Sequence, residues 1–241
     1  MKVLVAEDDQ LIREGLVDIL RQEGYHTVEA ADGKDALLQY EASTPDFICL
    51  DIMMPALSGY DVCKAIRQKD AQVPIIFISA KSEEIDKVLG LELGADDFIV
   101  KPFGVKEVVA RIRAVTRRCF ARIPANEANE SVTPFEFGPW QVFPKQLRAA
   151  HGETQIELSM REVSLLNYFS ANEGCVLSRD AIFTACWDES FFPSSRTLDQ
   201  HIVKLRKKVE TDPKNPTLIH TVHGIGYRYE PPSDEASDKK G

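Results

Sequence analysis

The chain begins MKVLVAEDD, residues 1–9, in which the apolar run Val3–Ala6 ends in three consecutive acidic residues. Helix-period segments separate it from four further runs of strand length, which are His26–Glu29, Phe47–Leu50, Ile75–Ser79 and Phe98–Val100. Strands that alternate with amphipathic helices are typical of βαβ units, which build a parallel sheet covered on both faces. The sequence therefore predicts a doubly wound (βα)5 α/β domain over residues 1–118, with its site at the carboxyl edge of the sheet.

Polar side chains stand where these predicted strands end. Glu7 and Asp8 follow the first strand, Asp51 follows the third, Ser79 ends the fourth and Lys101 follows the fifth. A parallel sheet brings these ends together, and three clustered carboxylates need a cation, for which Mg²⁺ is suited by its preference for hard oxygen ligands. Asp51 could then attack a phosphoryl group as a carboxylate nucleophile, while Lys101 neutralises the phosphoryl oxygens and Ser79 donates a hydrogen bond to one of them.

Each of these residues also has an ordinary structural explanation. Asp8 and Asp9 could cap the following helix, because helix N-termini favour acidic side chains, and for Asp9 this explanation is preferred. Lys101, which precedes a proline, could be a surface lysine. The combination at four strand ends nevertheless favours a phosphoacceptor pocket over four unrelated coincidences.

The second half has a different pattern. Residues 119–132, CFARIPANEANESV, have weak apolar periodicity and predict a flexible linker. Ser159 and Glu162 form a capping-box signature at the start of a helix. Short antiparallel strands are expected before that helix, at Phe135–Trp140, Gln141–Phe143 and Leu147–Ala150. Two more helices are expected after it, at Arg179–Trp187 and about Ser195–Glu210, followed by a hairpin of Leu218–Val222 and Tyr227–Tyr229.

Three helices followed by a β-hairpin predict an α+β winged helix-turn-helix domain over residues 133–231. The remaining residues, 232–241, are polar and charged, and they are predicted to be a disordered tail.

The net charge of −9 argues at first against a nucleic-acid partner, but the charge is unevenly distributed. Residues 1–60 contain four Lys/Arg and twelve Asp/Glu, a net charge of −8, whereas residues 196–228 contain seven Lys/Arg and three acidic residues, a net charge of +4. An acidic half joined to a basic segment indicates different partners for the two halves.

The last predicted helix has an apolar stripe, Leu198, Ile202, Leu205 and Val209, and an opposite polar face. A basic, polar face on this helix suits the major groove of double-stranded DNA. The candidates for base edges are Gln200, His201 and Lys204; those for phosphates are Arg196, Thr197 and Lys207; Arg206 could do either or pack. The alternative, which would be preferred for this helix alone, is a solvated charged face.

The five cysteines are Cys49, Cys63, Cys119, Cys175 and Cys186, an odd number without C-x-x-C pairs or zinc-ligand spacing. Reduced thiols in a reducing compartment are therefore expected. The first apolar run is too short for a signal peptide or a membrane span, so a cytoplasmic location without a membrane partner is expected.

Residues 1–118 resemble the receiver domain of bacterial response regulators. The matching stretches are Val3-Leu4-Val5-Ala6-Glu7-Asp8-Asp9, Leu50-Asp51-Ile52-Met53-Met54-Pro55 with Gly59, Ile78-Ser79-Ala80-Lys81, and Gly94-Ala95-Asp96-Asp97-Phe98 through Lys101-Pro102-Phe103. The resemblance implies that Asp51 accepts phosphate from a sensor histidine kinase. It also implies that Asp8, Asp51 and the Met53 carbonyl bind Mg²⁺, with Glu7 acting through water, that Lys101-Pro102 is cis, and that Ser79 and the aromatic Phe98 form the switch.

Residues 135–230 resemble the winged-helix output domain of the OmpR/PhoB subfamily. The resemblance rests on Leu158-Ser159 through Glu162, Leu165-Leu166, Arg196-Thr197-Leu198-Asp199 with His201-Ile202, Leu205-Arg206-Lys207, and Thr221-Val222 with Gly224 and Gly226-Tyr227-Arg228. It implies DNA contacts from the wing at Thr221, His223 and Tyr227, and a structural role for Asp199. His223 stands where the subfamily usually has arginine, and a neutral histidine gains less in a narrow minor groove.

The same subfamily pairs two receivers through their fourth and fifth helices, which implies a homodimer. The matching positions are Lys87, Leu91, Asp96, Asp97, Glu107, Arg111 and Arg113. The expected pairs are Lys87 with Glu107, Asp97 with Arg111 and Asp96 with Arg113; the alternative is a set of surface charges or pairs within one chain.

The sequence thus predicts a phosphorylation-dependent transcription regulator, with RNA polymerase as a further candidate partner. Its only expected catalysis is phosphorylation and dephosphorylation of its own receiver. A phosphate relay or protein adaptor is the alternative of a different class, and basic residues on the last helix favour DNA. A constitutive DNA binder with a degenerate receiver is disfavoured, because all the pocket residues are present.

Overall fold

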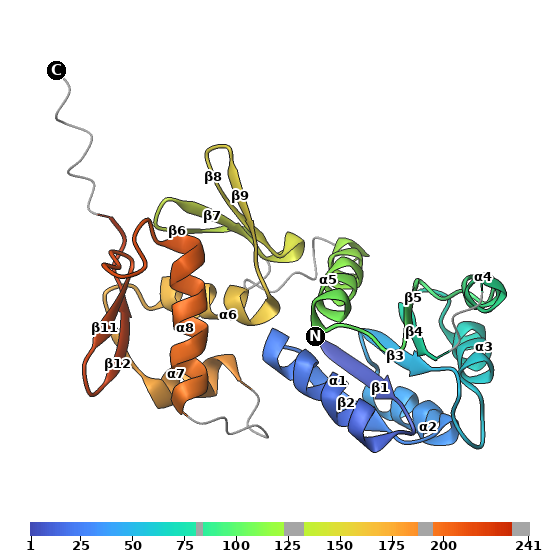
Figure 1. Ribbon diagram of the computed structural model, residues 1–241. Coiled ribbons are helices and arrows are strands. Elements are labelled where there is room, and N and C mark those ends of the chain that lie inside the picture. The colour runs from blue at the N-terminus through green and yellow to red at the C-terminus, as the bar shows by residue number, and fades with distance from the viewer. Residues whose placement is uncertain (81–83, 123–132, 188–194, 233–241) are drawn as a thin grey trace. The chain divides into compact units, whose positions relative to one another are not determined.

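The computed structural model describes residues 1–80, 84–122, 133–187 and 195–232, without the side chains of 84–87, 120–122 and 195–196. The chain folds as two compact units, Met1–Pro124 and Ala125–Gly241, and each is described by itself (Figure 1). Within the described residues, no helix is both long and apolar enough to span a membrane.

The first unit is built on a parallel sheet, as the strand pattern predicted. Its strand order is β2-β1-β3-β4-β5, so the chain reverses its direction of winding between β1 and β3. The strands are β1 Lys2–Ala6, β2 His26–Ala30, β3 Phe47–Asp51, β4 Ile75–Ser79 and β5 Asp97–Val100. All residues of β3 and β4 are buried, as expected for central strands covered on both faces. The (βα)5 doubly wound fold is confirmed.

Helices connect these strands, and α1 packs against α5 while α2 packs against α3. Asp9 caps α1, because its side chain accepts hydrogen bonds from the backbone N–H groups of Leu11 and Ile12. Asp32 and Ser58 cap the next two helices in the same way. The helices are α1 Gln10–Glu23, α2 Gly33–Ser43, α3 Gly59–Lys69, α4 Glu84–Glu92 and α5 Val105–Arg122.

The second unit begins with a four-stranded antiparallel sheet in the order β6-β7-β8-β9. The strands are β6 Phe135–Phe137, β7 Trp140–Phe143, β8 Arg148–His151 and β9 Thr154–Glu157, with the 3-10 turn Pro144–Gln146 between β7 and β8. The expected first strand, Phe135–Trp140, was too long. Gly138, at φ 55°, makes a two-residue turn with Pro139, so that Trp140 starts the second strand and pairs with Phe137. The strand β9 was not predicted.

Three helices and a wing follow. The elements are α6 Met160–Ala171, β10 Val176–Ser178, α7 Arg179–Cys186, α8 Ser195–Val209, β11 Ile219–Val222 and β12 Gly226–Tyr229. The predicted capping box is present, because Ser159 accepts from the Glu162 N–H and Glu162 accepts from the Ser159 N–H. The hairpin gains an unpredicted third strand, since β10 pairs with β12 in the order β10-β12-β11. The winged helix-turn-helix fold is confirmed.

Candidate functional site

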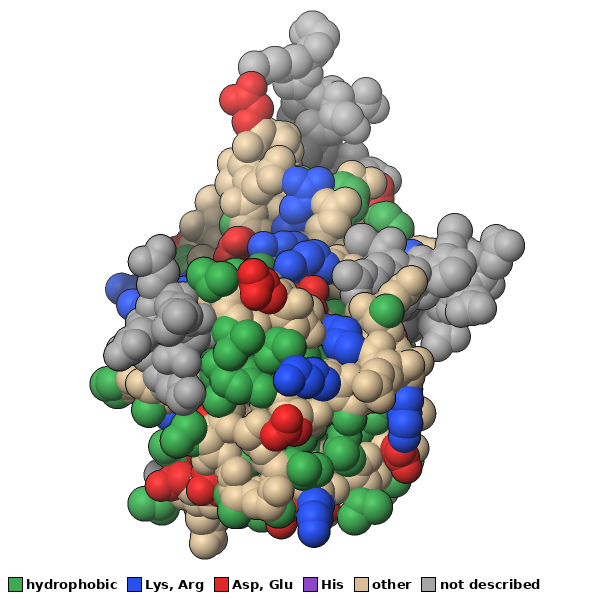
Figure 2. All heavy atoms as spheres, turned by 90° about the vertical axis from the view of Figure 1, so that its right-hand side faces the viewer, with side chains coloured by type: hydrophobic (Ala, Val, Ile, Leu, Met, Phe, Trp, Pro, Cys, Tyr) green, Lys and Arg blue, Asp and Glu red, His purple; other side chains and the backbone are tan. Residues whose placement is uncertain are grey.

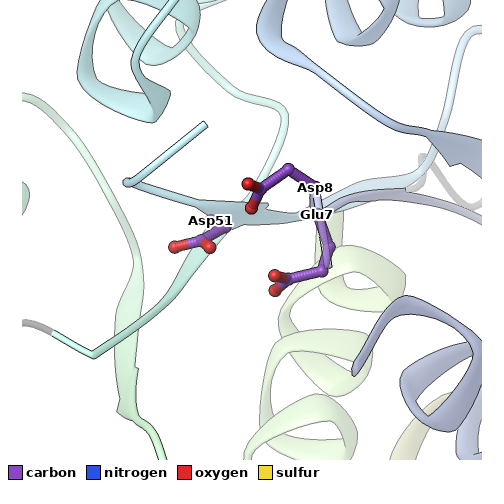
Figure 3. Close-up of side chains that lie close together, drawn as sticks. All are labelled: Glu7, Asp8 and Asp51. Atoms are coloured by element: carbon purple, nitrogen blue, oxygen red, sulfur yellow. The ribbon is translucent and has the colours of Figure 1, made fainter. Parts of the chain in front are cut away.

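The predicted acidic residues meet at the carboxyl edge of the first sheet (Figure 3). Carboxylate oxygens of Glu7, Asp8 and Asp51 all lie within 4.8 Å of one another. The register of β1 and β3 pairs Ala6 with Leu50, which places the next residues, Glu7 and Asp51, side by side. Glu7 and Asp51 are buried, whereas Asp8 is exposed, so the cluster opens to solvent on one side.

Lys101 bridges the two buried acids of this cluster. Its Nζ lies 2.8 Å from Glu7 Oε1 and 2.8 Å from Asp51 Oδ2. Burial raises the pKa of Glu7 to about 7, against the opposing effect of Lys101 and with the help of the Asp51 charge. One lysine facing three carboxylates leaves the cluster short of positive charge. A set of hard oxygen donors with this deficit fits a divalent cation such as Mg²⁺.

The other residues predicted for this pocket lie around Asp51. The backbone N–H of Met53 donates to Asp51 Oδ1 at 3.1 Å, which brings the backbone of Met53 beside the carboxylate. Ser79 is fully buried at the end of β4, directly after Ile78, the partner of Asp51 in the sheet. Phe98 is half-buried, with its ring centroid 6.3 Å from that of Phe77. The Lys101-Pro102 bond is cis, as the resemblance implied.

Two supporting residues were not singled out from the sequence. Arg13 on α1 donates from Nη1 to the Glu7 carbonyl oxygen at 2.7 Å, and its Nε lies 3.6 Å from Glu29. Gly59 starts α3 so close to β3 that a Cβ there would lie 2.1 Å from the Asp51 carbonyl oxygen. In the sequence, Arg13 could have been identified as a basic residue about one helical turn after three consecutive acidic residues. Gly59 was named there only as part of the stretch that resembles receiver domains.

The exposed side of α8 contains part of the predicted DNA-binding set. Gln200, Lys204 and Lys207 are exposed, and Thr197 is half-buried. Val203 lies among them with 51% of its surface exposed, and sequence reasoning missed it. The Arg196 side chain lies outside the described residues. The wing presents Thr221 and His223 as exposed residues.

Two other predicted contact residues, Tyr227 and Arg206, are turned inward instead. Tyr227 is only 4% exposed, and its hydroxyl donates to Asp199 Oδ1 at 2.6 Å, in keeping with a structural role for Asp199. Arg206 donates to the Ile219 carbonyl and, at 2.9 Å, to Thr221 Oγ1. These bonds tie α8 to the wing, which gives Tyr227 and Arg206 little freedom to contact DNA directly.

His201 occupies an intermediate position on α8. Its ring lies edge-on to Trp187, with 5.4 Å between centroids, and the Arg161 guanidinium lies over the same indole at 4.4 Å. Burial, helped by the nearby Lys204 and Arg161 charges, lowers the pKa of His201 to about 4. His201 is therefore a neutral imidazole near pH 7. Lys208, further along α8, donates to the Glu162 carboxylate at 2.7 Å.

The predicted dimer face shows its charges paired within one chain. Arg111 lies 2.9 Å from Asp97 and 3.0 Å from Glu107. Arg113 binds Glu23 of α1 at 2.8 Å. Asp96, the partner expected for Arg113 in the dimer, instead lies 3.4 Å from Arg67 and 4.0 Å from Arg118. Within one chain, Arg113 is thus engaged by Glu23, which disfavours the expected Asp96–Arg113 pair between two chains without testing it. The Lys87 side chain lies outside the described residues.

Apolar side chains are exposed next to these charges. On α4, Val88 is 48% exposed, Leu89 is 41% exposed and Leu91 is 54% exposed. Figure 2 faces the side of the receiver with α3 and α4, where apolar side chains gather among basic and acidic ones. This combination suits a protein contact better than a solvated surface.

Comparison with known proteins agrees with both halves of this description. The family model "Response regulator receiver domain" matches residues 3–113, and "Transcriptional regulatory protein, C terminal" matches residues 152–229. The alkaline phosphatase synthesis transcriptional regulatory protein PhoP of Bacillus subtilis is 41% identical over 233 residues, 96% of this chain and 97% of that protein. The sensory transduction protein RegX3 of Mycolicibacterium smegmatis is 41% identical over 229 residues, 95% of this chain and 98% of that protein.

Among solved structures, the response regulator DrrB of Thermotoga maritima, an OmpR/PhoB homolog, is 28% identical and covers 95% of this chain and 98% of that chain, with a TM-score of 0.45. A receiver with an acidic pocket joined to a winged helix defines a two-component response regulator that regulates transcription. With full-length relatives of this kind at 41% identity, the chain belongs to the OmpR/PhoB family of response regulators.

Proposed function

We propose that Asp51 is the phosphoacceptor of this regulator and that a sensor histidine kinase is its phosphoryl donor. The observation that supports this most directly is the pocket itself, in which Asp51 lies among two further carboxylates and 2.8 Å from Lys101. An Asp51 oxygen forms the new bond to phosphorus while the bond from phosphorus to the donor imidazole nitrogen breaks. The imidazole leaves with the electron pair of that bond.

Asp8, Asp51 and the Met53 carbonyl would hold Mg²⁺, and Glu7 would act through a bound water. When bound, Mg²⁺ supplies positive charge to the phosphoryl oxygens. Lys101 already lies at the end of β5 with its ammonium on Asp51, so a small displacement carries it to a phosphoryl oxygen. Arg13 holds the segment between β1 and α1 in place, because it donates a hydrogen bond to the Glu7 carbonyl oxygen.

Ser79 and Phe98 would transmit phosphorylation to the rest of the receiver. The Ser79 hydroxyl donates a hydrogen bond to a phosphoryl oxygen, which draws the end of β4 towards Asp51. Phe98 lacks a hydroxyl, so it responds by packing alone, against Phe77 and beneath Gly90. This movement reaches β5 and α4, and α4 carries the exposed apolar side chains Val88, Leu89 and Leu91.

Two receivers would then associate through α4, β5 and α5. In this dimer Arg111 exchanges its partner Asp97 within the chain for Asp97 of the second copy, and Lys87 approaches Glu107 of that copy. Arg118 takes the role expected from the sequence for Arg113, because it lies beside Asp96 while Arg113 is held by Glu23. Exposed charge pairs of this kind select orientation more than they add affinity.

In the winged helix, α8 would enter the major groove of DNA. Gln200 and Lys204 are placed to reach base edges, with His201 beside them as a neutral donor or acceptor. Arg196, Thr197 and Lys207 would meet phosphates, and Thr221 and His223 would follow the backbone or minor groove from the wing. Arg206 and Tyr227 act as positioning residues, since they join α8 to the wing.

Phosphorylation-dependent DNA binding is tested with the full chain and a duplex selected by it from a random pool. Beryllofluoride with Mg²⁺, which mimics a phosphoryl group on a carboxylate, should tighten binding by the wild type and leave Asp51→Asn unchanged. The matched control Asp18→Asn, at an exposed carboxylate on α1, should respond like the wild type. Binding should also weaken steeply with salt, because phosphate contacts release counterions. An equal response of Asp51→Asn would refute the assignment.

The dimer is tested by reversing one charge pair. Arg111→Asp should remain monomeric after beryllofluoride treatment, and the double variant Asp97→Arg with Arg111→Asp should dimerise again. Light scattering reports the mass of each. If Arg111→Asp dimerises as the wild type does, this face is not the interface.

A further inference from the structure

Val203 stands out on the surface of α8. It lies on the exposed side of the helix, with Gln200 three residues before it and Lys207 four residues after it, a spacing that places all three on one face. Its neighbour Lys204 is exposed as well. The side chain of Val203 is 51% exposed, the highest value among the valines of the described winged-helix residues.

The stability of the domain does not account for a valine at this position. The core stripe of α8 is formed by other residues, all buried, which are Leu198, Ile202, Leu205 and Val209. A β-branched side chain on the exposed face loses rotamer freedom and lowers helix propensity compared with alanine, lysine or glutamine. Val203 therefore neither packs in the core nor favours the helix, and its role is to be sought in what contacts this face.

The surroundings of Val203 indicate the chemistry of that contact. Lys204 and Lys207 make the face positively charged, which complements the phosphate backbone of DNA. In the major groove, the apolar feature of a base-pair edge is the C5-methyl group of thymine; the other groups are hydrogen-bond donors and acceptors. An apolar side chain between Gln200 and Lys207 cannot satisfy a donor or acceptor, but it can cover a methyl group.

We propose that Val203 contacts the methyl group of one thymine and thereby fixes a preference for thymine at that position of the binding site. This inference rests on the proposed role of α8 as the major-groove helix. Gln200 and Lys204 would read polar edges next to the same thymine, so that Val203 adds specificity which neither of these polar side chains can supply.

The experiment uses the full chain with Mg²⁺ and beryllofluoride and a duplex selected from a random pool. Each thymine is replaced in turn by deoxyuridine, which lacks only the methyl group, and the Kd is measured by fluorescence anisotropy. One replacement should weaken wild-type binding about fourfold, the effect expected for the burial of one methyl group. Val203→Ala should lose its sensitivity at that position and keep the sensitivity of the wild type elsewhere.

The matched control is Val176→Ala, at a valine that is 43% exposed on β10 and outside α8; it should behave as the wild type does. The inference is overturned if no thymine replacement affects the wild type, or if Val203→Ala keeps every sensitivity. Lys204→Ala separates this failure from a failure of the proposed function. Suppose that the thymine experiment fails but Lys204→Ala still weakens DNA binding: α8 then contacts DNA, and only the proposed thymine contact is wrong. If Lys204→Ala leaves DNA binding unchanged as well, the proposed role of α8 is also wrong.

Discussion

Gly59 offers a test of how tightly α3 is built onto the phosphoacceptor strand. Gly59 is the first residue of α3, and its N–H donates to the Ile52 carbonyl at 3.0 Å. A Cβ at this position would lie 2.1 Å from the Asp51 carbonyl oxygen and 2.9 Å from the Asp51 carbonyl carbon. Both obstacles are backbone atoms, so no side chain can rotate away to make room.

The variant Gly59→Ala must therefore move either α3 or the end of β3. Relief to 3.0 Å, below which real Cβ contacts essentially do not occur, requires a shift of 0.9 Å, the difference between 3.0 Å and the 2.1 Å observed. Forced displacement of this kind typically costs about 1–3 kcal/mol of stability. With a urea dependence of about 2 kcal/mol per molar, the unfolding midpoint of the receiver should fall by about 0.5–1.5 M.

Far-UV circular dichroism measures this midpoint, and tryptophan fluorescence provides an internal reference. Both tryptophans, Trp140 and Trp187, lie in the winged-helix unit, so their transition should not change. The control Gly15→Ala makes the same substitution on the exposed side of α1, where nothing lies within 4 Å of the new Cβ. It should stabilise the receiver by about 0.5–1 kcal/mol. Equal midpoints for the two variants would refute the close approach of α3 to Asp51.

Three further variants test other parts of the structure. Ala56→Gly should stabilise the receiver by about 0.5 kcal/mol, measured by circular dichroism in urea, because Ala56 is held at φ 66° in the left-handed region. Glu210→Gln should lower the stability of the winged-helix unit by about 1.5–3 kcal/mol, measured by tryptophan fluorescence, because the buried Glu210 carboxylate accepts N–H groups of Thr217, Leu218 and Ile219. The pKa of His201, about 4, lies below its ordinary value near 6.5, so stability should be lost between about pH 6.5 and pH 4 as the unfolded chain takes up the proton. His201→Gln should show a smaller difference between the urea midpoints at pH 7 and pH 5.

The receiver and its pocket could be predicted from the sequence because each parallel strand ends in a residue with distinct chemistry. Once the strands are placed, the topology alone brings Glu7, Asp51 and Lys101 together. The cap at Asp9 and the capping box at Ser159 are likewise local, since their partners lie within a few residues. Features of this kind need no knowledge of long-range packing.

The winged helix was harder to predict in detail because its short strands depend on their partners. Thr154–Glu157 is mostly exposed and Val176–Ser178 has only three residues, so neither shows a periodic pattern; both are fixed by pairing, with β8 and β12. The inward turn of Arg206 and Tyr227 is also a tertiary effect, because their partners Ile219 and Asp199 are 13 and 28 residues away. The helical period could have identified Val203, which follows the buried Ile202 and departs from the apolar stripe.

The measurement that tests the central claim most directly is the intact mass of the full chain after incubation with acetyl phosphate and Mg²⁺. The wild type and the control Asp18→Asn should each gain one phosphoryl group, and Asp51→Asn should gain none. Omission of Mg²⁺ should abolish the gain, because the carboxylates of Glu7, Asp8 and Asp51 would then face the incoming phosphoryl group without enough positive charge. A phosphoryl group on Asp51→Asn equal to that on the wild type would contradict the account.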